Sequence, residues 1–464
     1  MRAESQAVRG QWQTLLDFLH ALKLGALPPR VLAGARGCLL DALGCGLFGA
    51  RQPWSRIMAE EAYAERARGV ASVLGQAETT AATLAALCNG TSMHGFELDD
   101  LLDEAIVHPG AVIVPAALAA AEATGASGAR LLLGILAGYE VGNRVGLALG
   151  VEPARKGFHK TTLAGPVAAA IAAGIVIGLS REQLAAAAGL ACSAASGIKS
   201  FAAGSGGGMM KRMHAGRAAE AGVRMAQLAA RNFTGPPTAV DGRFGLLEVF
   251  AGESAAPARL SARLGEAWAT DDVFVKVYPV CSWIQSTVQQ LVALRGERAL
   301  DANAIARVRI GVSAYAIRSN GEPAPIDTMG AQYSIPYCAA LALTANPSDP
   351  AQYDDAAVAE PARRALARRV ELHVDAEMEA AYPKHYGARV ELEVAGSGRR
   401  ESRVLDPHGM PADPCSDAER LQKFARLAGA ALAPDRVEAV SQTVQRCEQL
   451  ASVRELTALL KEAR

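Results

Sequence analysis

The sequence lacks an excess of charge of either sign. Its 464 residues include 47 basic and 47 acidic side chains, so the formal net charge is zero. No basic tail or long run of one charge is present, and such a run is the usual footprint of a protein that binds nucleic acid. We therefore expect no nucleic-acid partner.

The sequence also lacks any CxxC pair, because its eight cysteines are scattered along the chain. This spacing excludes a zinc or iron–sulfur site built on CxxC pairs and argues against a disulfide framework, although it leaves open a cluster held by dispersed cysteines. The chain starts with the polar segment MRAESQAVRGQWQT, which has no apolar stretch of the kind found in signal peptides. Both features predict a reducing compartment, the cytoplasm.

Long hydrophobic runs are rare as well. The longest extends from Leu163 to Leu179, contains Pro166 and is rich in glycine and alanine. It is a little short for a membrane span. We therefore predict a buried core helix here and no membrane partner.

Aromatic residues make up only 5% of the chain, whereas half of its residues are hydrophobic and alanine is very common. Small side chains let helix axes approach closely, so this composition favours helix packing over sheet sandwiches. Apolar residues at three- and four-residue spacing predict a series of helices. These helices are expected near 11–23, 29–48, 79–93, 111–124, 127–148, 162–178, 181–195 and 215–231.

The pattern changes after about Asp271. Apolar and polar residues alternate at 308–318, 369–377, 388–396 and 399–405, which predicts strands, the last two forming a hairpin. Helices are expected between them near 281–296 and 334–344, and the last fifty residues are again amphipathic. The predicted fold is therefore mainly α with a smaller α+β part. A large helical domain comes from both chain ends, at 1–269 and 411–464, and the α+β domain is inserted at 270–410.

Two glycine-rich motifs are weak signals of nucleotide binding. GCGLFG at 44–49 matches the dinucleotide pattern but follows a helical segment instead of a strand, so its glycines are expected to permit close packing. GSGGGMMKR at 204–212 lacks both the glycine directly before the lysine and the strand of a phosphate loop. The acidic segment from His94 to His108 fits neither HExxH nor an EF-hand. Its density of carboxylates and histidines could bind a metal, and the other interpretation is a solvated acidic helix end. We expect no metal and no organic cofactor.

Lysine is rare, with nine residues in the whole chain. Lys199 and Lys211 nevertheless bracket a glycine-rich apolar segment, and Lys276 lies in the apolar stretch DVFVKVYPV. A buried lysine needs an anion beside it, and its pKa shifts readily, which suits acid–base chemistry. The alternative is an ordinary exposed lysine on a loop.

Three histidines, His108, His159 and His214, lie where a loop meets a predicted helix. A histidine at a helix N-terminus tends to be neutral at pH 7, and the nearby amide groups can hold a carboxylate. Isolated histidines are more often structural than catalytic. Together with the rare lysines and a group of carboxylates, however, these three predict an anion-binding pocket with several acid–base groups.

Six segments resemble the MmgE/PrpD family, and they occur in the family's order over about residues 10 to 460. They are NGTSMHGFELDD, HPG, GFHKT, KRMHAGRAAEAGVRMAQLAARNFTGP, KVYPVC and QYSIPYCAALAL. The family includes enzymes that dehydrate 2-methylcitrate, decarboxylate cis-aconitate or epimerise iminodisuccinate. The resemblance implies a helical domain with a smaller α+β lid, a homodimer, a pocket between the domains and no iron–sulfur cluster.

The resemblance also implies roles for individual residues. The catalytic positions fall on His108, His159, Lys211, Lys276 and Tyr337. The acidic substrate-binding position falls on Glu97, with Asp99 and Asp100 behind it. We add His214 and Cys281 as substrate-binding candidates from their places in these motifs.

The implied reaction is proton transfer at a carbon next to a carboxylate, in a lyase that acts on a small di- or tricarboxylate. The two lysines would stabilise the enediolate-like charge, and Tyr337 would protonate or orient a leaving hydroxyl. Elimination, decarboxylation and epimerisation share this intermediate. An epimerase of an amino-dicarboxylate and a carboxylate-binding protein without activity therefore stay open.

This sequence departs from the family pattern at two positions. Leu101 follows the two aspartates where many members have threonine, and Cys281 stands where some members carry histidine. Both changes remove a polar group from the expected pocket. We therefore expect the substrate to differ from 2-methylcitrate and cis-aconitate.

Overall fold

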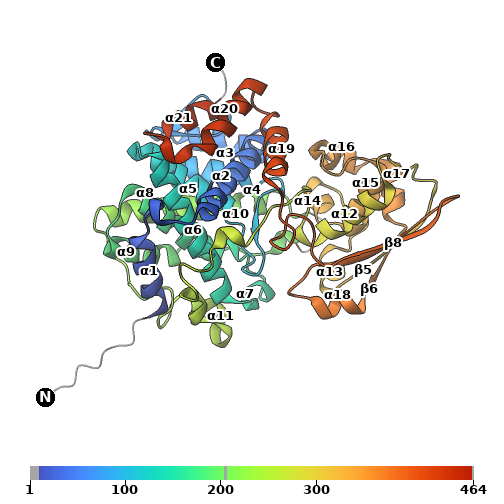
Figure 1. The fold of residues 1–464 in the computed structure, drawn as a ribbon, viewed down its shortest axis with the longest axis horizontal. Helices are drawn as coiled ribbons and strands as arrows, with labels where there is room; N and C mark the ends of the chain where they lie inside the picture. The colour runs from blue at the N-terminus through green and yellow to red at the C-terminus, as the bar shows by residue number, and fades with distance from the viewer. Residues whose placement is uncertain (1–9, 203–205, 462–464) are drawn as a thin grey trace.

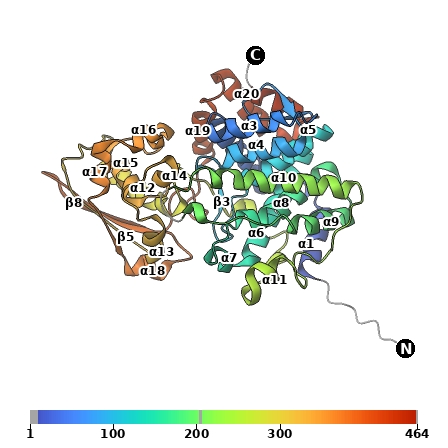
Figure 2. The same cartoon turned by 180° about the vertical axis from the view of Figure 1, so that it is seen from behind.

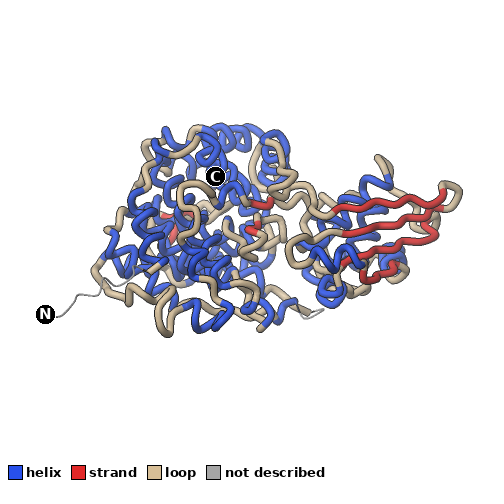
Figure 3. Tube along the Cα trace, turned by 60° about the horizontal axis from the view of Figure 1, so that its bottom comes forward, coloured by secondary structure: helices blue, strands red, loops and turns tan. Residues whose placement is uncertain are grey.

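The protein has two lobes of unequal size in the computed structural model, which describes residues 10–202 and 206–461 (Figure 1). The polar segment before residue 10 and residues 204 and 205 of the glycine-rich motif lie outside the described residues. The larger lobe is almost entirely helical and contains elements from both ends of the chain. The smaller lobe carries the main sheet (Figure 3).

The larger lobe is built mostly from the first half of the chain. Its helices there are α1 (Gln11–Ala21), α2 (Pro29–Ala50), α3 (Pro53–Ala64), α4 (Ala82–His94), α5 (Gly110–Thr124), α6 (Gly128–Leu149), α7 (Glu152–Arg155), α8 (Thr161–Ile177), α9 (Arg181–Cys192), α10 (Met210–Ala230) and α11 (Leu246–Ala251). All eight helices that the apolar spacing predicts are present. Helices α3, α7 and α11 were not predicted, and α10 starts five residues earlier than predicted.

The C-terminal helices return to the larger lobe. They are α19 (Asp417–Ala428), α20 (Pro434–Gln445) and α21 (Arg454–Thr457), and α19 packs along α2. Helix α2 also packs closely on α4. A Cβ added at Gly49 would lie 1.9 Å from the Ser92 carbonyl oxygen, so the GCGLFG glycines serve helix packing as predicted.

The smaller lobe contains a four-stranded sheet with the order β6-β5-β7-β8. Its strands are β5 (Ile305–Val312), β6 (Val370–Val374), β7 (Ala388–Val394) and β8 (Gly398–Val404). The predicted hairpin is present as β7 and β8, which pair antiparallel. The strand predicted over 308–318 is too long, because the Ser313 side chain accepts a hydrogen bond from the Ala316 amide and starts a helix.

Within the described residues, the smaller lobe also contains seven α-helices. They are α12 (Ser282–Arg295), α13 (Ala314–Asn320), α14 (Thr328–Gln332), α15 (Ile335–Thr344), α16 (Asp355–Val358), α17 (Pro361–Ala367) and α18 (Ala376–Ala381). The two lobes have separate main hydrophobic cores. The second core also takes in Trp54, Phe96 and Leu98 of the larger lobe, so its apolar contacts extend across the junction between the lobes.

Two apolar helices lie in the core of the larger lobe. Helix α8 holds most of the longest apolar run, and every one of its residues from Thr161 to Val176 is buried, as predicted for a core helix. Helix α2 is long and apolar enough to cross a membrane by length and composition, but 67% of its most apolar stretch is buried inside the protein. Burial of this kind is typical of a core helix.

Candidate active site

A short sheet joins the acidic segment to the segment that carries Lys276. Strand β3 (Leu101–Leu102) pairs antiparallel with β4 (Val273–Phe274). Glu97 lies just before β3 and Lys276 just after β4, so antiparallel pairing brings the two residues to the same end of this sheet. Glu97 has a φ of 58°, a left-handed conformation that costs free energy for a non-glycine residue and is most often retained at functional sites.

Lys211 reaches the same point as the second residue of α10. Helix α10 runs across the larger lobe (Figure 2). Helix α10 can lie this close to α4 because Gly216 has no side chain, and a Cβ there would lie 2.2 Å from the Leu87 carbonyl oxygen. This contact fixes α10 against the helix whose C-terminal end leads to Glu97.

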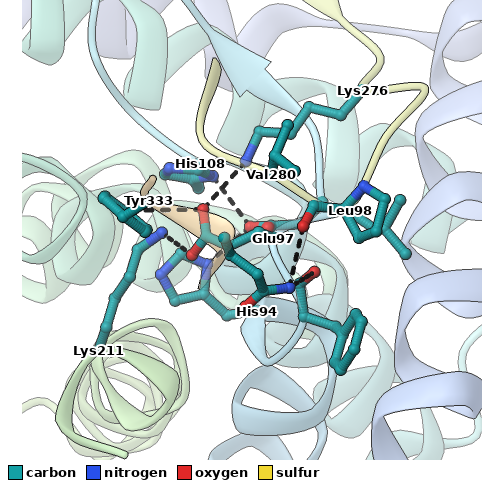
Figure 4. Close-up of polar contacts among 12 residues, drawn as sticks. His94, Glu97, Leu98, His108, Lys211, Lys276, Val280 and Tyr333 are labelled. Carbon is teal, nitrogen blue, oxygen red and sulfur yellow. Dashed lines mark hydrogen bonds and ion pairs between the residues drawn. The ribbon is translucent and has the colours of Figure 1, made fainter. Parts of the chain in front are cut away.

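The carboxylate of Glu97 is the centre of a buried ion network. Lys211 donates to Oε1, and Nζ of Lys276 lies 3.4 Å from Oε2. The hydroxyl of Tyr333 lies 3.5 Å from Oε2. Figure 4 shows the two ammonium groups approaching Glu97 from different sides. Both lysines and Glu97 are 1% exposed, so all three charges are shielded from water.

The charges in this network set the protonation of its members. Burial would raise the pKa of Glu97, but Lys211 and Lys276 outweigh it and hold the pKa below its usual value. Burial lowers the pKa of Lys211, although Glu97 opposes that shift. For Lys276, burial is outweighed by Glu97 and Asp99, and the pKa is raised. Lys276 is therefore the more permanent cation, and Lys211 gives up its proton more easily.

Gln332 fixes the backbone around this network. Its side-chain amide donates to the carbonyl oxygens of Phe96 at 2.9 Å and Pro279 at 3.0 Å. Its Oε1 accepts a hydrogen bond of 3.0 Å from Arg212. A residue of the smaller lobe thus holds in place the segments that carry Glu97, Lys276 and Lys211.

Four histidines form a second group next to the first. Nδ1 of His94 lies 2.6 Å from Oδ2 of Asp99, and Nδ1 of His108 lies 3.0 Å from the same oxygen. His159 continues the group, since its Nδ1 lies 3.0 Å from Nδ1 of His214. His108 and His159 lie two residues before the starts of α5 and α8, as the sequence predicts, whereas His214 lies inside α10 and does not open it.

Burial makes these imidazoles weak bases. It lowers the pKa of His94 and of His214 to about 4, and it lowers the pKa of His108 and His159 as well, helped by the nearby lysines. The four rings are therefore uncharged at pH 7. An uncharged imidazole can accept a proton from a substrate.

His94, Asp99 and His108 also have the proximity of a metal-ligand group, since one atom from each lies within 4.8 Å of the others. The two Nδ1 atoms already lie at hydrogen-bond distance from the Asp99 carboxylate. An ion bound here would have to replace these contacts. The expectation of a metal-free site stays a prediction.

A cavity of about 310 Å³ opens beside both groups. Glu97, His108, His159, Lys211 and Lys276 all line it, and so do the two positions that depart from the family pattern, Leu101 and Cys281. Burial and the charge of Glu97 raise the pKa of the Cys281 thiol, so this residue is uncharged. This size fits a small substrate.

The prediction that Tyr337 belongs to the site is not met by the structure. Its hydroxyl donates to the Gln352 carbonyl oxygen at 2.9 Å and accepts from Arg363 at 3.1 Å, inside the core of the smaller lobe. Tyr333, four residues earlier, lines the cavity instead. The reason is that Tyr337 lies inside α15, on a turn that packs into that core.

Asp100 and His214 support the site without lining the cavity. Asp100 accepts hydrogen bonds from the Tyr139 hydroxyl at 2.6 Å and from the Gly110 amide at 2.8 Å, which fixes the start of α5. His214 contacts His159. Asp99 acts on the cavity through His108. These three predicted substrate-binding residues thus surround the residues that reach the cavity.

Sequence reasoning missed several residues that line the cavity or hold it in place. They are His94, Asp103, Arg318, Gln332 and Tyr333. His94 and Asp103 belong to the acidic segment, but nothing in the sequence separates them from its other polar residues. Tyr333 and Gln332 start the motif QYSIPY, but their neighbours in space are more than fifty positions away in the sequence, so local pattern gives no signal for them.

The chain matches two family models, the MmgE/PrpD N-terminal domain over residues 13–258 and the MmgE/PrpD C-terminal domain over residues 278–449. It is 29% identical to a cis-aconitate decarboxylase-like protein of Aspergillus oryzae, over 96% of both chains. It is 27% identical to a cis-aconitate decarboxylase of Aspergillus terreus, over 99% of this chain and 97% of the relative. A human cis-aconitate decarboxylase is also 27% identical, over 97% and 94%.

Proposed function

Since this chain belongs to the MmgE/PrpD family, we propose that it is a lyase that acts on a small di- or tricarboxylate by proton transfer at a carbon next to a carboxylate. The observation that carries the proposal is the cavity in which a glutamate, two buried lysines and uncharged histidines meet. The names of the relatives make cis-aconitate the first tricarboxylate to test.

The charges around the cavity support an anionic substrate. Four cations line it, Lys199, Lys211, Lys276 and Arg318, but only two carboxyl groups, Glu97 and Asp103. Lys199 and Arg318 form no ion pair with any of the described residues 10–202 and 206–461, and both lie beside Tyr315. A substrate with more than one carboxylate would supply the missing negative charges.

The two lysines have different roles in the proposed mechanism. Lys276 keeps its proton and holds a substrate carboxylate, where it stabilises the negative charge that develops on that group. Lys211, with its lowered pKa, exchanges a proton with the substrate. Glu97 holds both ammonium groups in position before the substrate enters.

The histidines provide the base. His108 and His159 line the cavity uncharged, and Asp99 orients the ring of His108 through its Nδ1. One of them removes or relays the substrate proton, and Asp99 stabilises the imidazolium that forms. The chemistry proposed here uses only these side chains and no cofactor.

A second candidate is an epimerase of an amino-dicarboxylate. Leu101 and Cys281 favour it, because they place an apolar side chain and an uncharged thiol in the cavity at positions where other members carry polar groups. Epimerisation needs one acid–base group on each face of a carbon, and Lys211 with His108 would provide the pair.

A panel of di- and tricarboxylates, starting with cis-aconitate, citrate and iminodisuccinate, separates these possibilities. The proposal expects a product with a new or shifted double bond, or release of carbon dioxide, from at least one acid. Inverted stereochemistry alone indicates the epimerase. Binding without turnover of any acid would contradict both and leave a binding protein. Lys211→Met serves as the inactive control.

A further inference from the structure

We propose that Asp103 is a specificity-determining residue that binds a carboxylate of the substrate in its protonated form, as a carboxylic acid. This inference rests on the proposed function, since it requires a carboxylate substrate. It assigns a role to a residue outside the network around Glu97.

The register of β3 places Asp103 at the cavity. Leu101 and Leu102 form β3, in which successive side chains point to opposite faces. Leu101 and Asp103 line the cavity, whereas Leu102 does not. Asp103 therefore continues the face that begins with Leu101, and it brings a carboxyl group to the wall where Leu101 presents only methyl groups.

No cation compensates this carboxyl group. Its Oδ1 is buried and has no hydrogen-bond partner, and Asp103 forms no ion pair among residues 10–202 and 206–461. The two charged groups that act on its pKa are both acidic. Asp406 comes from the smaller lobe and is paired with His385 at 2.8 Å, and Glu104 is paired with Arg259 at 3.0 Å.

The surroundings of Asp103 favour the uncharged form. Burial, and then the charges of Asp406 and Glu104, raise the pKa of Asp103 to about 8. Tyr386 of the smaller lobe also lies close, but its own pKa is raised by burial and it stays uncharged. Asp103 therefore carries a proton at neutral pH and can donate a hydrogen bond.

A carboxylic acid and a carboxylate form a strong hydrogen bond, because the acceptor is charged. An ionised aspartate at the same place would repel the substrate instead. The role of Asp103 therefore depends on pH, and it is the opposite of the role of Glu97, which carries its negative charge to hold the lysines. A polar hydrogen-bond donor is thus restored two residues after the position where Leu101 lacks one.

The test measures the Kd of propane-1,2,3-tricarboxylate, a probe that cannot undergo elimination, by calorimetry at pH 7 and pH 9. In Asp103→Asn the amide donates a hydrogen bond at both pH values. The Kd of the natural chain divided by that of Asp103→Asn is expected to rise about tenfold from pH 7 to pH 9, because Asp103 loses its proton around pH 8. A ratio that does not change with pH would overturn the inference while leaving the proposed function intact.

Two further variants sharpen this test. Asp406→Asn removes a negative charge that holds the proton on Asp103, so the loss of binding is expected at lower pH. Asp103→Leu has no donor and is expected to bind weakly at both pH values. Unchanged pH dependence in Asp406→Asn would count against the inference. If the natural chain does not bind the probe at all, the polycarboxylate class and the role of Asp103 both fail.

Discussion

Four carboxyl groups of the acidic segment have surroundings of two opposite kinds. Glu97 and Asp99 form its first half, and Asp100 and Asp103 form its second half. Lysines surround Glu97, and histidines surround Asp99, so both carboxylates have lowered pKa values. Asp100 contacts only uncharged donors, and its pKa is raised to about 7 by burial and by Asp41. No hydrogen bond reaches the buried Oδ1 of Asp103 from the part of the chain that the structure describes, and its pKa is raised to about 8.

The comparison shows that four carboxyl groups within seven positions have different functions because of what packs against them. The first half holds negative charge, which Glu97 uses for ion pairs with lysines and Asp99 uses to hold the imidazoles, and the second half holds protons. The residue types alone would give all four the same charge at pH 7. The following experiments test this contrast.

Removal of Lys211, the cation paired with Glu97, has the largest expected effect. Lys211→Met takes away the group that exchanges a proton with the substrate, and turnover is expected to fall about a thousandfold. The matched control is Lys160→Met, because Lys160 is also buried but has no hydrogen-bond partner among the described residues and does not line the cavity. Steady-state kinetics of both variants make the comparison, and equal losses would contradict the role of Lys211.

Loss of charge at Glu97 is expected to cost stability. Glu97→Gln leaves two buried ammonium groups without their carboxylate, so the free energy of unfolding is expected to fall by about 3 kcal/mol at pH 7. Asp103→Asn removes no ion pair, so its free energy of unfolding is expected to stay the same or rise. Denaturant titrations of both variants measure this, and an equal fall in the free energy of unfolding would contradict the contrast.

Two tyrosines distinguish the cavity from the core. Tyr333→Phe removes the hydroxyl next to Glu97 and is expected to lower turnover about tenfold, with little change in stability. Tyr337→Phe removes two hydrogen bonds in the core, so about 1 kcal/mol of stability is lost and turnover is retained. Loss of turnover in Tyr337→Phe would instead support the catalytic role that the sequence predicts for Tyr337.

The pH dependence of stability has opposite signs in the two halves. The pKa of Asp103 is higher in the folded chain than the usual 3.8. Its contribution to the free energy of unfolding is therefore full below pH 3.8 and disappears as the pH rises through about 8. The lowered pKa of Glu97 gives a contribution that is present above pH 4.5 and disappears as the pH falls below that value. Relative to the natural chain, Asp103→Asn is expected to gain on the order of 1 kcal/mol between pH 5 and pH 8.5. Thermal melts at both pH values measure this gain, and no gain would contradict the raised pKa.

The fold was largely predictable from the sequence because apolar spacing predicts helices locally. The bounds of α5 and α8 agree with prediction within one residue. The parallel pair β5–β6 was not predicted, since the sequence between these strands contains five α-helices and gives no register. Pairing of distant segments depends on the whole chain.

The candidate site was predicted only in part, because local sequence signals mark some of its residues and not others. Lys211 and Lys276 stand out because lysine is rare, and His108 and His159 stand out at helix starts. Tyr337 was chosen by motif, whereas the cavity contains Tyr333, one helical turn away. Asp103 could not be separated from the other acidic residues by sequence, because only its unpaired surroundings distinguish it.

The central claim is that proton transfer at a carbon next to a carboxylate depends on Lys211. The most direct measurement is NMR of the best substrate after turnover in deuterated water, with the natural chain and with Lys211→Met. One carbon-bound deuterium next to a carboxylate is expected with the natural chain, in the product or in recovered substrate, and none with Lys211→Met. A decarboxylated or epimerised product without carbon-bound deuterium, or equal incorporation by both proteins, would contradict the central claim.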